Sequence, residues 1–249
     1  MKLIARGLLV FITLLLIWEM VAVLFHLPSY ILPTPFEVIK TLYFQKNLLL
    51  HEAIPTVTET LCGLILGIII GSFTAILMAF VRPVSYWLLP SLIISQAIPT
   101  FAIAPLLVIW FGYGMASKIV TTIIMLFFPI TSAFYDGLKQ TDSGFLDLAK
   151  TMQAKKSRIF WFIRIPAALP HLASGIRVAT VIAPIGAIIG EWVGSSHGLG
   201  FLMLNANARM QIDLMFAALF VIMAFSLLLY FAVNQLLKFL IFWQVKESS

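Results

Sequence analysis

The most regular feature of the chain is a series of long apolar runs separated by short polar segments. Several of these runs approach or exceed the roughly 18 to 20 residues that a helix needs to cross a bilayer, beginning with residues 7–25. The runs are continuous and rich in Leu, Ile, Phe and Ala, unlike the short alternating segments of a membrane β-barrel. The pattern therefore predicts an all-α, polytopic membrane protein.

We expect about six transmembrane helices that form a single permeation domain over residues 1–249, because every connection is too short to hold a second fold. A proline-rich stretch, LPSYILPTPFEV, follows the first span and predicts an extended path before a short amphipathic helix that begins at Phe36. The predicted spans lie near residues 7–25, 60–80, 87–111, 117–135, 172–194 and 216–242.

Composition supports the membrane assignment and argues against a soluble domain and against a nucleic-acid-binding protein. Only 10% of the residues are charged, against about 25% in an ordinary soluble domain. Lys2 and Arg6 give the first run the basic start of a cleaved signal peptide. The run is long, however, and no small-residue cleavage site follows it, so we interpret it as a retained span. The formal net charge of +6 is divided among loops, so no nucleic-acid partner is expected.

The distribution of basic residues predicts the orientation of the chain. With six spans and the amino terminus inside, twelve bases face the cytoplasm and four face the opposite side, as the positive-inside rule requires. Both termini are then cytoplasmic. The twelve are Lys2, Arg6, Arg82, Lys139, Lys150, Lys155, Lys156, Arg158, Arg164, Arg177, Lys238 and Lys246, and the four are Lys40, Lys46, Lys118 and Arg209.

Charge is concentrated in the cytoplasmic loop 136–171, within the stretch FLDLAKTMQAKKSRIFWFIRIPAALP. A first helix is predicted there because its apolar residues fall at i, i+3, i+4 and i+7. A second, short helix is predicted after it, with Ser157 as its cap and Pro166 as its end. This hairpin is either a basic loop that lies along the membrane surface or a docking element for a soluble partner. The apolar positions of the first helix are Phe145, Leu148, Ala149 and Met152.

The same block resembles the EAA loop of ATP-binding-cassette (ABC) importer permeases, with Asp147, Leu148 and Ala149 at the E-A-A positions. In that family the loop is a coupling helix that inserts into a cleft on the ATPase subunit. One departure is that Gln153 stands where the family usually has a glycine, which affects the expected turn. The resemblance implies that the residues contacting the ATPase are Asp147, Leu148, Ala149, Met152, Gln153, Ala154, Lys155, Ser157 and Phe160.

Three further stretches, LPTPFEVIKTL, IPTFAIAPLLVIWFGYGMASK and GEWVGSSHGLGFLM, are similar to permeases that import nitrate, sulfonates and taurine. The segment APIGAIIGEWVGSSHGLGFLMLNANARMQIDLMFAAL resembles the branch associated with hydroxymethylpyrimidine, a thiamine precursor. The resemblance implies a type I importer fold in the bacterial inner membrane, which receives its solute from a periplasmic or lipid-anchored binding protein. The solute would be a thiamine pyrimidine precursor or, alternatively, a sulfonate, taurine or nitrate-type anion.

The chain carries no sequence signature of an energy source or of catalysis. A P-loop needs two glycines five positions apart followed by Lys and Ser or Thr, and no pair of glycines has that spacing. ATP and Mg would then be used by a separate ATPase, present in two copies, and this chain would bind no cofactor itself. The four histidines are scattered without metal-ligand spacing, so neither a metal site nor an enzyme is expected. Because ABC transporters use two membrane halves, we expect a homodimer surrounded by membrane lipid.

Two sets of glycines recur every four residues near the second and fifth spans. Such ladders let helix backbones approach closely. They pack neighbouring helices of one subunit or, alternatively, form the seam of a dimer. The glycines are Gly63, Gly67, Gly71, Gly186, Gly190, Gly194 and Gly198.

Five residues are candidates for the translocation pathway. Glu19 and Glu59 are weaker candidates, because both are near span ends, where solvent exposure or helix packing is the stronger interpretation. Glu191 is a carboxylate within a span, where an unpaired charge is costly, so we favour a position facing a cavity over an interfacial position. Gln96 carries an amide that can both donate and accept, toward a solute or equally toward another helix. Pro99 suggests local unwinding at membrane depth. Asn205 and Asn207 belong to a polar stretch that forms either an outer gate or a capped surface loop.

An ion-coupled secondary carrier is the alternative from a different class. It would require inverted repeats and buried ionisable relays near the midplane. Neither pattern is evident in the sequence.

Overall fold

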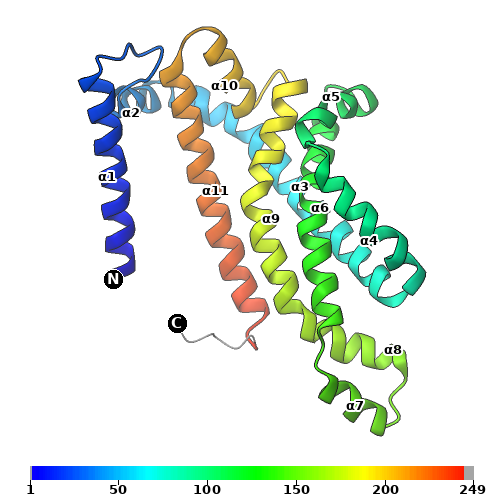
Figure 1. The fold of residues 1–249 in the computed structure, drawn as a ribbon. Helices are drawn as coiled ribbons and strands as arrows, with labels where there is room; N and C mark the ends of the chain where they lie inside the picture. Colours follow the sequence, from blue (N-terminus) through cyan, green and yellow to red (C-terminus); the bar gives the residue numbers. More distant parts are fainter. Residues whose placement is uncertain (1, 244–249) are drawn as a thin grey trace.

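The computed structural model describes residues 2–243, and the side chains of these residues other than 2–8, 11 and 82. Over that range the regular elements are all helices, as the apolar pattern predicted (Figure 1). They are α1 (Lys2–Leu24), α2 (Pro35–Phe44), α3 (Lys46–Phe80), α4 (Arg82–Ala97), α5 (Thr100–Phe111), α6 (Met115–Lys139), α7 (Ser143–Thr151), α8 (Lys156–Ile159), the π-helical turn η1 (Phe160–Arg164), α9 (Ile165–Gly194), α10 (Leu199–Ala208) and α11 (Ile212–Leu240).

The centre of the bundle is α6, which packs between α3 and α9 (Figure 1). Both glycine ladders close onto it. A β-carbon on Gly63 of α3 would lie 2.6 Å from Cβ of Thr122, and one on Gly186 of α9 would lie 2.8 Å from its Cα. Since lipid chains are as apolar as leucine, close packing of this kind is what holds membrane helices together. The ladders therefore pack the helices of one chain, which was one of the two alternatives.

The helix α1 stands at the edge of the bundle and contacts it through few groups (Figure 1). The ring of Trp18 lies 5.3 Å from that of Phe216 and 6.0 Å from that of Phe220 on α11. Most of the other described side chains of α1 are exposed, and all of these except Thr13 are apolar, such as Leu16 and Leu24. An apolar surface of this size on a peripheral helix fits contact with lipid.

The predicted span 87–111 is not one straight helix. The chain bends by 103° between α4 and α5, so the two helices form either a broken span or a re-entrant loop. Pro99 has no backbone N–H and forces the residue before it out of the helical region, and Ile98 accordingly has ψ 118°. The local unwinding predicted at Pro99 is confirmed. Among the described residues, four other helices are individually long and apolar enough to span, namely α3, α6, α9 with its preceding turns, and α11.

The segment before the second span is more helical than predicted. The amphipathic helix expected from Phe36 is present as α2, which begins with a capping box between Thr34 and Glu37. The next helix, α3, begins at Lys46 instead of near residue 60, and Pro55 lies inside it. The extra turns place polar residues of α3 beside the ends of other helices, which matters for the site described below.

The second helix of the predicted hairpin also differs from the prediction. Its N-cap is Lys155, without a side-chain hydrogen bond, so Ser157 is not the cap. Pro166 does not end the helix, because η1 shifts the hydrogen bonding to i→i−5, with Ile165 N–H donating to the carbonyl of Phe160. A π-turn of this kind accommodates the missing N–H of Pro166. The helix therefore runs from Lys156 to Gly194.

The hairpin formed by α7 and α8 lies at one end of the bundle, and α2 and α10 lie at the other (Figure 1). The start of α1 and the end of α11 are directed toward the hairpin end (Figure 1). We call these the hairpin end and the α10 end. Of the bases used to predict orientation, Lys246 and the side chains of Lys2, Arg6 and Arg82 lie outside the described residues.

Candidate functional site

The outer surface of α7 presents an apolar stripe to solvent. Phe145 is 61%, Leu148 60% and Met152 73% exposed, at the helical spacing that the sequence predicted. The fourth member of that pattern, Ala149, is buried instead. Three large apolar side chains on a short exposed helix form a surface suited to a partner protein.

The turn after α7 keeps its geometry without the usual glycine. Gln153 adopts φ +55°, the left-handed conformation that glycine accepts most easily. Its N–H donates to the carbonyl of Lys150, and the N–H of Ala154 donates to the carbonyl of Ala149. These two bonds are those of a Schellman motif, which satisfies the last carbonyls of a helix. The departure from the family pattern therefore leaves the turn intact, at a conformational cost of about 1 kcal/mol.

The other residues expected to contact an ATPase divide into two groups. Asp147, Lys155 and Ser157 are exposed, and Asp147 accepts a hydrogen bond from Lys150 at 2.8 Å. Phe160 is only 4% exposed and belongs to the core cluster that includes Met78, Leu92 and Phe134. The exposed Phe80 ring packs edge-on against it. A direct contact of Phe160 with a partner is therefore excluded in this conformation, because the π-turn directs its ring into the bundle.

A second group of functional side chains lies at the α10 end, where α3, α6 and α9 meet. We call it the carboxylate cluster, and it consists of Glu52, Thr56, Glu59, Lys118 and Glu191. All five residues are at most 9% exposed, and Glu191 is fully buried. Lys118 Nζ lies 3.1 Å from Glu59 Oε1. Buried charges are stable only when they are paired or hydrogen-bonded, so the cluster holds three spans in a defined arrangement.

The carboxylate cluster also caps α10. The first N–H groups of a helix have no partner within it, and α10 has no local side-chain cap. Instead, the N–H of Gly198 donates to Glu52 Oε2 at 2.6 Å and that of Gly200 to Glu191 Oε2 at 2.5 Å. The N–H of Leu199 donates to Thr56 Oγ1 at 2.9 Å. Negative side chains at a helix N-terminus are favourable, so α3 and α9 anchor α10 through its exposed backbone groups.

The position of Glu191 differs from the expectation of a cavity-facing carboxylate. Its Oε1 accepts a hydrogen bond from Thr56 at 2.6 Å, and no part of its surface is exposed. Gly198 does not extend the glycine ladder of α9, since that helix ends at Gly194. It has φ +109°, and a β-carbon there would collide with the Glu191 carboxylate. The backbone at Gly198 therefore requires glycine for two independent reasons.

Of this cluster, the sequence indicates Glu191 as a candidate and Glu59 as a weaker one, but it does not predict that they lie in one cluster. Lys118 entered only as one of the bases on the outer side, and Glu52 was not considered. The available signal was a pair of opposite charges, Glu59 and Lys118, near the outer ends of two spans, because such charges in a bilayer seek each other. Within the described residues, Glu59 Oε2 has no hydrogen-bond partner.

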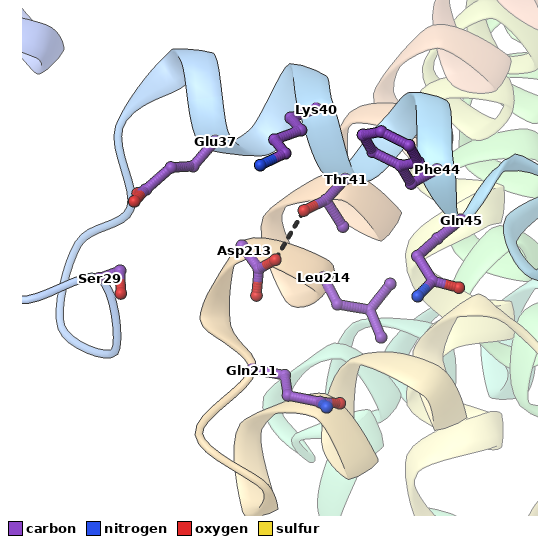
Figure 2. Close-up of a pocket in the computed structure, with 9 residues that line it drawn as sticks. All are labelled: Ser29, Glu37, Lys40, Thr41, Phe44, Gln45, Gln211, Asp213 and Leu214. Carbon is purple, nitrogen blue, oxygen red and sulfur yellow. Dashed lines mark hydrogen bonds between the residues drawn. The ribbon is translucent and has the colours of Figure 1, made fainter.

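Two cavities with polar lining residues lie at the α10 end, and one of them reaches the cluster through Glu52. One, of about 390 Å³, lies between α2 and the start of α11 (Figure 2). Figure 2 shows Thr41 of α2 directed at Asp213 of α11, to which it donates a hydrogen bond at 2.6 Å. The other, of about 340 Å³, is lined by Glu52, Asn205 and Arg209. Both are lined by Gln45, Gln211 and Leu214, so they are neighbours.

The five candidate pathway residues are not brought together in one site. Gln96 and Pro99 are exposed at the bend between α4 and α5. Asn205 lines the smaller polar cavity, and Asn207 is exposed near the end of α10. A pathway role for these residues stays a prediction. In the part of the chain that the structure describes, no group of three His, Cys, Asp or Glu side chains could hold a metal ion.

Comparison with known proteins identifies relatives that match most of the chain. Residues 63–241 match the family described as "Binding-protein-dependent transport system inner membrane component". A "Probable ABC transporter permease protein" of Haemophilus influenzae is 53% identical over 96% of this chain and 98% of its own. The "Formylaminopyrimidine transport permease protein ThiX" of Halalkalibacterium halodurans is 35% identical over 95% of each chain. The "Putative aliphatic sulfonates transport permease protein SsuC" of Bacillus subtilis is 29% identical over 87% of this chain and 79% of its own.

The fold has counterparts among solved structures. A chain from the "Crystal structure of an amino acid ABC transporter with histidines" superposes with a TM-score of 0.62. The superposition covers 81% of this chain and 96% of the other, at 16% sequence identity. Similarity at this level of identity concerns the fold alone, and it confirms the predicted type I arrangement of helices.

Proposed function

The chain belongs to the binding-protein-dependent transport system inner membrane component family, as a permease subunit of an ABC importer, and we propose that it carries a thiamine pyrimidine precursor. Members of this family are membrane subunits without catalytic activity, and ATP is hydrolysed by a separate ATPase. The proposal therefore concerns the solute, the partners and the orientation.

The observation that carries the proposed solute is the similarity to the formylaminopyrimidine permease over nearly the whole of both chains. Formylaminopyrimidine and hydroxymethylpyrimidine share a heteroaromatic ring with polar substituents. An importer for sulfonates is the second candidate, supported by the lower identity to the sulfonate permease. Substrate preference can change within one fold, so direct measurement must decide between the two.

The hairpin is the element that we propose to couple this chain to its ATPase. Its exposed apolar stripe of Phe145, Leu148 and Met152 supports a protein contact, and the exposed Asp147 and Lys155 lie beside it. Two ATPase copies that bind ATP and Mg, and two copies of this chain, would complete the transporter. In this arrangement the hairpin end faces the cytoplasm, with both termini, and the membrane is the bacterial inner membrane, as the distribution of bases indicates.

A periplasmic or lipid-anchored binding protein would deliver the solute at the α10 end. That end carries the polar cavities beside α2 and α10 (Figure 2). The carboxylate cluster contributes Glu52 to one of these cavities and fixes α10 through its backbone. We propose that this anchoring keeps the docking surface and the outer ends of the spans in register during transport.

The test is reconstitution of the chain with its ATPase and its binding protein in liposomes. A pyrimidine transporter should accumulate labelled formylaminopyrimidine or hydroxymethylpyrimidine in an ATP-dependent manner, and an excess of taurine or of an alkanesulfonate should not compete. Competition by the sulfonates alone would select the second candidate. Accumulation without ATP would contradict the importer assignment for this chain.

A further inference from the structure

A cavity of about 560 Å³ lies at the hairpin end, between α3, α7 and the start of the long helix that includes η1. Its volume falls in the range of small-molecule sites, about 300 to 1,000 Å³. Part of its wall is apolar and part is basic. The apolar part includes Phe80, Ile159 and Phe160, and the basic part consists of Lys150, Lys156 and Arg164.

The charge in this cavity is unbalanced. Lys150 is paired with Asp147 at 2.8 Å on the surface of α7. Lys156 and Arg164 form no ion pair with any residue that the structure describes. No carboxylate among the described residues lines the cavity. Two uncompensated cations that face the same space, next to an apolar wall, favour a ligand with an anionic head and an apolar body.

The position of the cavity relative to the bilayer also favours a ligand with an anionic head and an apolar body. The span α3 ends at Phe80, and α9 begins directly after Arg164, so the cavity lies where two spans leave the membrane. Trp161 and Phe162 are next to it in the chain and are 54% and 77% exposed. Exposed aromatic side chains at the end of a span are typical of the headgroup region of a bilayer.

The cavity is distinct from the surface proposed to bind the ATPase. On a helix with 3.6 residues per turn, Leu146 and Lys150 lie on a different side from the stripe of Phe145, Leu148 and Met152. The first two residues line the cavity, whereas the stripe does not. A partner seated on the stripe would therefore contact a different face of α7 from the one that lines the cavity.

We propose that this cavity binds the headgroup of an anionic phospholipid, with Lys156 and Arg164 contacting its phosphate and with Phe80 and Ile159 contacting its first acyl carbons. The site goes beyond the proposed transport function. Only the assignment of the lipid to the cytoplasmic leaflet rests on the proposed orientation. A bound lipid would join the hairpin to the end of α3.

The test uses native mass spectrometry of the full-length chain in mild detergent, titrated with phosphatidylglycerol or with phosphatidylethanolamine of the same acyl chains. We expect one phosphatidylglycerol to bind with about tenfold higher affinity than phosphatidylethanolamine. The K156Q/R164Q variant should lose about tenfold or more of the affinity for phosphatidylglycerol, because each cation near a headgroup contributes about fivefold. The matched variant K139Q/R158Q removes two cations of the same end that do not line the cavity, and it should bind like the wild type.

Four outcomes would overturn the proposal. The first is equal binding of the two lipids, and the second is unchanged phosphatidylglycerol binding by K156Q/R164Q while the variant remains monodisperse. The third is loss of ATPase binding by that variant with lipid binding intact, which would assign the cavity to the protein partner. Displacement of the lipid by millimolar inorganic phosphate would show that a free anion is preferred, and would also contradict a lipid site. Because the readout does not involve solute uptake, failure here is separate from failure of the transport assignment.

Discussion

The two ends of the bundle are built on different physical principles. At the hairpin end, α7 carries its functional side chains on an exposed surface, and they sit close together in the sequence. At the α10 end, the functional groups are buried and come from α3, α6, α9 and the start of α10. Exposed ion pairs contribute little to stability, whereas breaking a buried pair is costly. The hairpin is therefore free to serve recognition, while the carboxylate cluster determines the arrangement of the spans.

The largest effect is expected from removing the cation of the carboxylate cluster. Lys118→Met leaves Glu59 buried without its partner and should lower the free energy of unfolding by about 3–5 kcal/mol. Thermal unfolding of the purified chain in detergent measures this effect. The double variant K118M/E59M should recover most of the loss, because apolar replacement of a whole buried pair is often neutral. The exposed pair Asp147 and Lys150 provides the comparison, and D147A/K150A should change stability by less than about 1 kcal/mol.

A single methyl group at the start of α10 should have the next largest effect. Gly198→Ala places a β-carbon against the Glu191 carboxylate at a backbone φ of +109°. Strain and overpacking together should destabilise the chain by about 3 kcal/mol. Gly112 is the matched control, because its φ is +80° and nothing lies within 4 Å of the position that a β-carbon would take there. Gly112→Ala should lose only about 1 kcal/mol, and equal losses at both positions would show that the carboxylate contact is unimportant.

A substitution in the hairpin should weaken binding of the ATPase without changing the stability of the chain. Leu148→Asp places a charge in the middle of the exposed stripe and should weaken binding of the ATPase by about 30-fold, or about 2 kcal/mol. The unfolding midpoint should stay near that of the wild type, because Leu148 is 60% exposed. Binding of the detergent-solubilised chain to immobilised ATPase measures the first quantity. Thr141→Asp, which adds a charge before α7 and away from the stripe, is the control. Unchanged binding by Leu148→Asp would remove the stripe from the coupling surface.

The smallest effect is expected at the turn after α7. Gln153→Gly removes the strain of a left-handed glutamine and should stabilise the Schellman turn by about 1 kcal/mol. Amide hydrogen exchange at Gln153 and Ala154, whose N–H groups form the two bonds of the turn, should slow by about fivefold. Met210 provides a control at the other end of the bundle, since it has φ +58° in the equivalent turn after α10. Met210→Gly should leave exchange in the hairpin unchanged.

Part of the α7–α8 hairpin could be predicted because its determinants are local. The spacing of Phe145, Leu148 and Met152 predicted one exposed apolar stripe, and the positions of charge and proline marked a second helix. Two predictions there were wrong. Ser157 is not the cap of the second helix, and that helix continues through Pro166 because of a π-turn. The turn accompanies the burial of Phe160 among residues such as Met78 and Phe134, which are far from it in the sequence.

The carboxylate cluster, in contrast, could not be predicted from local sequence. Glu191 could be recognised as a costly charge within a span, but its partners could not be chosen from several polar residues near span ends. The choice depends on the register in which α3 and α9 pack against α6, which the glycines at Gly63 and Gly186 permit but do not reveal by themselves. The expectation of an open cavity failed for the same reason, since α10 folds over the carboxylate and uses it as a cap.

The sequence by itself determined the helical membrane class, the positions of most spans, the basic loop and the family, because apolar length, charge distribution and short motifs are properties of contiguous residues. Only the tertiary structure decided how far α4 and α5 bend apart at Pro99, that both glycine ladders meet α6, and that Glu52 and Glu191 cap one helix from two others. These features are set by packing and hydrogen bonding between segments separated by many residues, where a buried polar group bonds to whichever neighbour the fold brings within reach.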